Sequence, residues 1–195
     1  MTRIVLFAAL PEEYAPLKRM VGPWSHRSSR PFRSFLRLLP GKELLLVETG
    51  MGPARIREAL EWIHGTSPAD VIVSLGFAGS LNEEYDVGEV YFGQSFMRLR
   101  SSSGKVPGEE LLLDRSEAIL GFCNHHRVGG ARVVTVDRPE SKQLLKRAFV
   151  DGPTVMDMES HIVALFAMRE CLPFFCFRGV SDGLEDAIDF DIHAI

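Results

Sequence analysis

Cysteine is scarce in this chain, and its spacing excludes two common kinds of structural site. Cys123, Cys171 and Cys176 are odd in number and show no CxxC spacing, which argues against a disulfide framework and a zinc site. No apolar run approaches the ~18 residues that a membrane span needs. The apolar first ten residues are followed by Pro11 and two glutamates in place of a signal-peptide cleavage site. The cytoplasm is therefore the expected compartment.

The sequence also lacks a basic block. Its 195 residues carry a formal net charge of −4, so the electrostatic footprint of a nucleic-acid-binding protein is missing. Charged residues make up 25% and hydrophobic residues 46% of the chain, as is usual in a globular domain. We expect a single domain whose partner is a small molecule.

Apolar runs alternate with helical spacing along most of the chain. Strands are predicted over residues 2–9, 32–39, 43–48, 69–75, 87–96, 131–136 and 173–180. Helices are predicted from residue 11, over 54–64, 114–123 and 140–149, and with an apolar face formed by Met158, Ile162, Leu165 and Phe166. Loops are predicted at 25–31 and 98–108, and glycine turns at 49–53 and 76–80. This order predicts an α/β fold with a mixed β-sheet flanked by helices on both faces.

Acidic side chains lie at three element edges, where α/β sheets place their ligands. Asp182 follows a buried strand and Glu159 begins a helix, while Glu12 and Glu13 open the first helix. Each also has a structural explanation, because an aspartate caps turns and first-turn acids suit the helix dipole. His161 and the other histidines show no metal-binding spacing, so we predict no metal site.

Taken together, these segments resemble the purine nucleoside phosphorylase and nucleosidase superfamily. Within it, the chain looks most like the methylthioadenosine/S-adenosylhomocysteine nucleosidase branch and the hopanoid-associated nucleoside phosphorylases. The resemblance runs in order from residue 2 to about residue 186. It is carried by residues 9–13, 48–52, 74–81, 87–90, 156–160 and 173–182, and it implies one nucleoside phosphorylase-like domain over residues 1–195.

The resemblance implies a role for each motif residue. It assigns Asp182 as the acid that protonates the purine at N7, with Ser181 orienting it. It assigns Glu159 to the ribose hydroxyls, Met158 to the sugar face and Glu13 to the activation of water. Phe77, Ala78 and Gly79 match the turn that lies beside the sugar and the nucleophile in the family.

The chemistry of the implied reaction agrees with these roles. Cleavage of a ribosyl N-glycosidic bond forms an oxocarbenium-like sugar and moves electrons onto the base. An acid at the base and an anionic group near the sugar serve both needs, as in glycoside hydrolysis. No metal or organic cofactor is required.

The nucleophile is indicated by two departures from the family pattern. Hexameric phosphorylases hold phosphate with an arginine where this chain has Ser74. At the next anion-binding position of the family this chain has Phe77, whose ring offers no hydrogen-bond donor. Water is therefore favoured over phosphate. Phosphorolysis stays an alternative if Arg55, Arg57 or an arginine of residues 25–33 binds phosphate instead.

Two further departures concern the base pocket and the C-terminus. The segment that commonly supplies a stacking aromatic reads Val-Asp-Arg-Pro-Glu at 136–140, which leaves Phe177 or an unmatched loop residue to stack on the base. The chain stops at Ile195, where relatives continue into a helix, so we expect a homo-oligomer to cover the exposed face. A catalytically weak nucleoside-binding protein is the remaining alternative.

Overall fold

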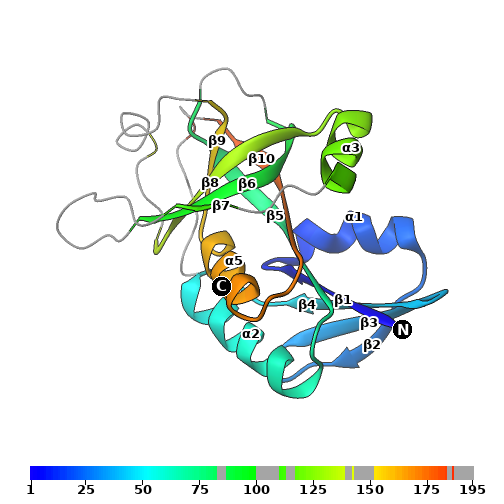
Figure 1. Cartoon of the computed structure of the whole chain (residues 1–195). Coiled ribbons are helices and arrows are strands. Elements are labelled where there is room, and N and C mark those ends of the chain that lie inside the picture. Colours follow the sequence, from blue (N-terminus) through cyan, green and yellow to red (C-terminus); the bar gives the residue numbers. More distant parts are fainter. Residues whose placement is uncertain are drawn as a thin grey trace.

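The computed structural model describes residues 1–82, 87–99, 110–112, 117–138, 142, 152–183 and 186. Its strands are β1 (Thr2–Ala8), β2 (Ser25–Ser28), β3 (Arg33–Leu39), β4 (Lys42–Glu48), β5 (Val71–Ser80), β6 (Val90–Leu99), β7 (Leu111–Leu112), β8 (Gly129–Val136), β9 (Thr154–Asp157) and β10 (Phe174–Asp182). Its helices are α1 (Pro11–Val21), α2 (Pro53–Thr66), α3 (Glu117–His126) and α5 (Ser160–Arg169). Figure 1 shows their arrangement.

The strands form one mixed sheet, as the sequence predicts. Strand β10 pairs with both β6 and β5, so β5, β10, β6, β8 and β9 close into a ring. From β5 the sheet extends outward in the order β1, β4, β3, β2. Parallel pairs such as β1 with β5 occur beside antiparallel pairs such as β10 with β6. Closure of the ring is a feature that the alternation of strands and helices did not predict.

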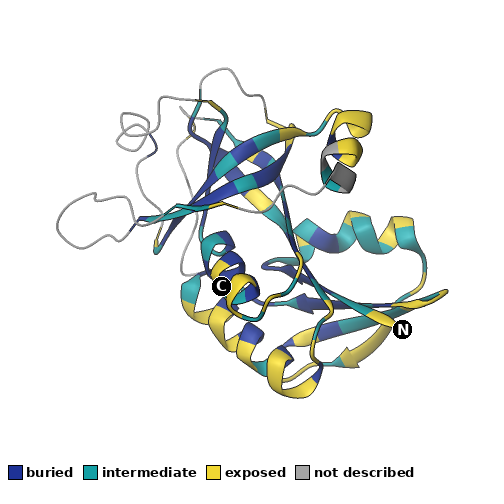
Figure 2. Ribbon diagram, in the orientation of Figure 1, coloured by how far each residue is buried: buried dark blue, intermediate teal, exposed yellow. Residues whose placement is uncertain are grey.

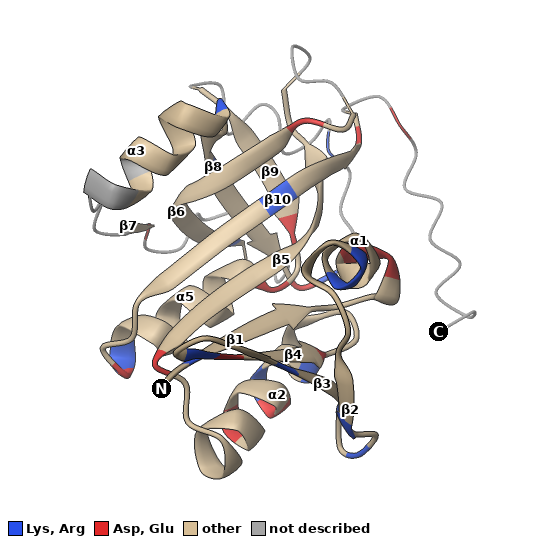
Figure 3. Ribbon diagram, turned by 90° about the vertical axis from the view of Figure 1, so that its right-hand side faces the viewer, with Lys and Arg blue, Asp and Glu red and all other residues tan. Residues whose placement is uncertain are grey.

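Helices cover both faces of the extended part of the sheet. Helix α1 lies on one side of β1 and β4, whereas α2 lies on the other, next to α5 (Figures 1 and 3). Pro11 occupies the first turn of α1 and Pro53 that of α2, where the missing N–H has no helical partner to lose. Among the described helices, none is long and apolar enough to cross a membrane.

Two predicted connections are strands instead. Residues 76–80 continue β5, because Gly76 pairs with Arg178 and Gly79 with Asp182 on β10. Their small side chains had indicated a turn, but strand pairing decides the conformation. Residues 25–28, predicted as a loop, form β2 at the sheet edge against β3. Such a polar, exposed strand carries no apolar alternation to reveal it.

The predicted apolar face of the last helix is also wrong in part. Met158 precedes α5, and Leu165 is 51% exposed. The buried residues are Ser160, Ile162, Val163, Ala164 and Ala167. Ser160, Ala164 and Ala167 are small and contribute little apolar signal, so a pattern of large apolar residues did not reveal them. The helix predicted at 140–149 lies outside the described residues except for Lys142, as does most of the segment 98–108.

The main core lies between the sheet and helices α2 and α5. Figure 2 shows buried positions along the strands and on the inner sides of these helices, with exposed positions outside. Helix α2 buries Ile56, Leu60 and Ile63 as its spacing predicts. They join Val5 and Leu45 of the sheet in a single cluster. This core fixes α2 against the strands whose ends surround the site.

Truncation of the core should lower stability far more than truncation of the surface. Leu45 is fully buried on β4, whereas Leu38 on the neighbouring strand is 58% exposed. We expect Leu45→Ala to lower the free energy of unfolding by ~2–5 kcal/mol because it removes apolar contacts and leaves a cavity. Leu38→Ala should change it by less than ~0.5 kcal/mol. Urea denaturation of the two variants measures both; equal midpoints would contradict the packing described.

Candidate active site

A cleft of about 640 Å³ opens where the ring meets the carboxyl ends of β1 and β4. It brings together Glu13, Glu159 and Asp182 with the neighbouring residues that the resemblance assigns to the site, but not Phe177. The lining residues are Ala9, Leu10, Glu13, Gly50, Met51, Arg55, Phe77, Ala78, Gly79, Val136, Arg138, Met156, Asp157, Met158, Glu159, Ser181 and Asp182. Acidic groups thus stand in an otherwise largely apolar wall.

Glu13 is held by backbone N–H groups from two elements. Its Oε2 accepts hydrogen bonds from Ala9 N at 2.6 Å and Leu10 N at 3.0 Å. Its Oε1 accepts one from Phe77 N on β5 at 3.0 Å. A Cβ at position 76 would lie 2.7 Å from Oε1, so Gly76 provides the space. These donors hold the carboxyl group in a fixed orientation.

Glu159 is the residue just before α5, not in its first turn as the sequence suggested. Its Oε1 accepts a 2.6 Å hydrogen bond from Gly52 N, and its Oε2 a 3.3 Å bond from Met158 N. Gly52 has a φ of 95°, a left-handed conformation that favours glycine. Burial, and then the charge of Asp157, raise the pKa of Glu159 to about 7. The side chain can therefore gain or lose a proton near neutral pH.

Asp182 ends β10 instead of following it. It pairs with Gly79 across a bulge that begins after Val180. The Ser181 hydroxyl donates to Asp182 Oδ1 at 2.5 Å, as expected for an orienting residue. The ammonium of Lys142 contacts the other oxygen, Oδ2. Both oxygens of this carboxylate thus face a donor.

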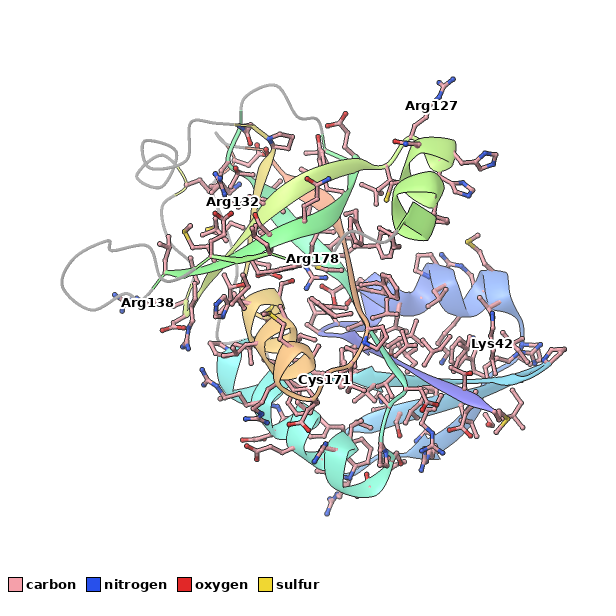
Figure 4. All side chains as sticks on the ribbon, viewed as in Figure 1. Lys42, Arg127, Arg132, Arg138, Cys171 and Arg178 are labelled. Carbon is pink, nitrogen blue, oxygen red and sulfur yellow. The ribbon has the colours of Figure 1, made fainter. Side chains whose placement is uncertain are left out.

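Beneath the cleft lies a buried ion pair that the sequence analysis missed. Arg178, the basic residue of β10 (Figure 3), donates from Nε to Asp157 Oδ2 at 3.0 Å. Its Nη2 donates to Ser74 Oγ at 2.8 Å and to Ser160 Oγ at 2.7 Å. Figure 4 shows Arg178 in the interior of the molecule. An arginine in an apolar strand needs a buried carboxylate, and this signal should have pointed to Asp157.

The ion pair borders a small polar cavity of about 10 Å³ below the cleft floor. Its polar side chains are Glu13, Thr49, Ser74, Glu159 and Arg178. Such a volume holds about one water molecule, and the lining offers it several partners. Ser74, which matches a phosphate-binding arginine of the phosphorylases, here accepts a hydrogen bond from Arg178.

The arginines suggested as substitutes for the phosphate ligands lie in different places. Arg55 lines the cleft. Arg27 instead bonds to Ser67 Oγ at 2.7 Å, and Arg33 pairs with Glu48 at 3.3 Å. Arg57 is exposed on α2 and lies outside the cleft lining.

Phe177, suggested as a stacking residue for the base, does not line the cleft. Its ring packs against Phe92 at 5.5 Å and Phe122 at 6.1 Å between ring centroids. Neighbouring side chains alternate between the faces of a strand, so Phe177 points away from the side that Arg178 occupies. The aromatic ring among the lining residues is that of Phe77, which is 46% exposed.

Among the described residues, no group of three or more His, Cys, Asp or Glu side chains is placed to hold a metal ion. The acids of the cleft are instead held by backbone amides, a serine and two cations.

The sequence profile of the phosphorylase superfamily matches residues 3–194. The 5′-methylthioadenosine/S-adenosylhomocysteine nucleosidase of Listeria welshimeri is 26% identical over 177 residues, which cover 78% of this chain and 75% of that protein. Among solved structures, the nucleosidase of the same description from Campylobacter jejuni has a TM-score of 0.79 at 19% identity, covering 100% of this chain and 91% of that one.

A further solved structure carries a ligand. The 5′-methylthioadenosine/S-adenosylhomocysteine nucleosidase of Neisseria meningitidis, in complex with methylthio-immucillin-A, has a TM-score of 0.78 at 22% identity. The match covers 98% of this chain and 91% of that one. These likenesses establish the fold.

The raised pKa of Glu159 makes stability depend on pH. The folded protein holds the proton of Glu159 up to about pH 7, whereas the ordinary value is 4.5. The resulting stabilisation is complete below the ordinary value and is lost as pH rises through about 7. We expect Glu159→Gln to raise the melting temperature relative to wild type more at about pH 8 than at about pH 4, because glutamine stays neutral. An equal difference at both pH values, measured by calorimetry, would contradict this assignment.

Proposed function

The chain belongs to the phosphorylase superfamily, and we propose that it is the kind of member that uses water. It is a nucleosidase that hydrolyses the N-glycosidic bond of a purine ribonucleoside or a 5′-modified adenosine to free base and sugar. The relative from Listeria welshimeri carries a nucleosidase name. The observation that carries the proposal is the convergence of Glu13, Glu159 and Asp182 on one cleft.

Asp182 acts on the leaving base. When the glycosidic bond breaks, its electron pair moves onto the purine, and a proton at N7 neutralises the developing charge. Asp182 reaches the cleft from the end of β10, and the Ser181 hydroxyl holds one of its oxygens. This contact fixes the carboxyl group in one orientation toward the bound base.

Glu13 acts on the nucleophile. Its carboxylate borders both the cleft and the one-water cavity beneath it. Three backbone N–H groups hold the carboxylate, so it can take a proton from water without changing its position. The phenyl ring of Phe77 stands beside it and offers phosphate no donor, which favours hydrolysis.

Glu159 and Met158 hold the sugar. The Glu159 carboxylate, when ionised, accepts hydrogen bonds from ribose hydroxyls and stabilises the oxocarbenium-like sugar. The apolar side chain of Met158 lies beside it along the cleft and covers one face of the ribose. Because the pKa of Glu159 is about 7, this binding strengthens as pH rises through neutrality.

The compartment and assembly belong to the same proposal. All three cysteines are free, and Cys171 is exposed, which suits the reducing cytoplasm. Large apolar side chains stay exposed at Leu112, Phe122, Leu165 and Met168, and association of identical chains would cover them.

The activity is tested with methylthioadenosine, S-adenosylhomocysteine, adenosine and inosine, each with and without phosphate. Release of free base that is independent of phosphate supports hydrolysis. Release that requires phosphate and yields ribose 1-phosphate selects a phosphorylase, for which Arg55 and Arg138 are cations that line the cleft. Base in none of the mixtures refutes the enzymatic proposal and leaves a nucleoside-binding protein.

The two catalytic acids can be tested against a matched neighbour. We expect Asp182→Asn and Glu13→Gln each to lower kcat by ~100-fold or more, because each removes an acid or base from the reaction. Glu12→Gln is the control, since Glu12 is exposed and lies outside the cleft lining, and it should keep wild-type turnover. Steady-state assays on variants with native circular dichroism decide; full activity in Asp182→Asn contradicts the assignment.

A further inference from the structure

Lys142 is a buried cation that contacts a carboxylate of the cleft. The residue is 3% exposed, whereas Lys18 is half-buried and Lys42 is exposed. Lysine is almost never buried unless it is paired, because leaving water is costly for its charge. Among the described residues, its ammonium contacts the Asp182 carboxylate and the carbonyl oxygen of Gly183.

The strand beside Lys142 leaves room for this pair. A Cβ at position 79 would lie 2.8 Å from Asp182 Oδ2 and 3.1 Å from the Cε atom of Lys142. Gly79 therefore allows the carboxylate and the lysine stem to pack directly against the backbone of β5. The pair is therefore packed inside the fold and is not a surface ion pair.

The same contacts connect Asp182 to a proton donor. Ser181 donates to Asp182 Oδ1, and Lys142 contacts Oδ2. A lysine ammonium carries three N–H donors, whereas a carboxyl group carries at most one. The proposed reaction needs Asp182 to give a proton, and Lys142 is placed to replace it.

We propose that Lys142 is the positioning residue that supplies this proton, an inference that rests on the proposed nucleosidase activity. As the bond between C1′ and N9 breaks, its electron pair passes to the purine and N7 takes a proton from Asp182. The Lys142 ammonium gives a proton to Asp182 to replace it, which leaves a neutral amine and returns the Asp182 carboxyl group to the form that it had before the reaction. Solvent reprotonates the amine after the products leave, so charge and atoms balance.

The leaving group provides the sharpest test. A p-nitrophenyl riboside releases its phenolate without protonation, so its cleavage needs no proton supply. We expect Lys142→Met to lower kcat for the purine nucleoside by ~100-fold, with KM nearly unchanged, because Lys142 acts through Asp182. Cleavage of the p-nitrophenyl riboside should stay within about threefold of wild type. Asp182→Asn should give the same pattern.

Two further variants separate proton supply from other roles. Lys142→Arg keeps the positive charge but does not release its proton at any accessible pH, so it should also lose purine cleavage selectively. Lys42→Met is the control, because Lys42 lies far from the ring in Figure 4 and its variant should match wild type with both substrates.

Each outcome decides between the inference and its alternatives. Wild-type purine cleavage by Lys142→Arg would overturn proton supply and leave only electrostatic positioning. Equal losses with both substrates in Lys142→Met and Lys142→Arg would show a structural role and overturn the inference. If wild type cleaves neither substrate, the proposed function itself fails, and this result is distinct from the failure of Lys142 to matter in an active enzyme.

Discussion

The buried pair of Arg178 and Asp157 organises the floor of the cleft. Arg178 on β10 reaches Asp157 at the end of β9, Ser74 on β5 and Ser160 at the start of α5. Asp157 also accepts a 2.7 Å hydrogen bond from Thr135 on β8. Two buried charges are tolerated only when their hydrogen-bonding capacity is filled, so these strands must stay in register around the pair. The closed ring of strands keeps the strands in this register. The pair therefore forms a rigid floor for the cleft above it.

Each acid of the cleft is also held by at least one segment that is distant from it in sequence. Glu13 takes donors from the connection before its helix and from β5, while Glu159 takes one from the turn before α2. Asp182 contacts Lys142 beside Gly79 of β5. Fixed donors of this kind replace solvent reorganisation during the reaction. They also place each carboxylate in a different electrostatic setting, which is how three similar groups can take different roles.

The sequence predicted most strands, the mixed sheet and the residues that gather in the cleft, because apolar periodicity and ordered motifs carry those signals. It did not predict that residues 76–80 extend β5, since only pairing with β10 reveals a strand rich in small residues. It offered Phe177 or an unmatched loop residue to stack on the base, but strand alternation sends the Phe177 ring toward Phe92. The link between Lys142 and Asp182 was hidden because the two residues are far apart along the chain and meet only in the fold.

Gly76 and Gly79 share one strand, and each lies against the carboxylate of a different acid, Glu13 and Asp182. Positions three apart in a strand are separated by about 10 Å, a span comparable to the spacing of paired carboxylates in inverting glycosidases. Strand β5 thus sets the separation between these two carboxylates, which in the proposed reaction serve the attacking water and the departing base. Because the strand backbone sets it, a different separation would require a break in the pairing of β5 with β10.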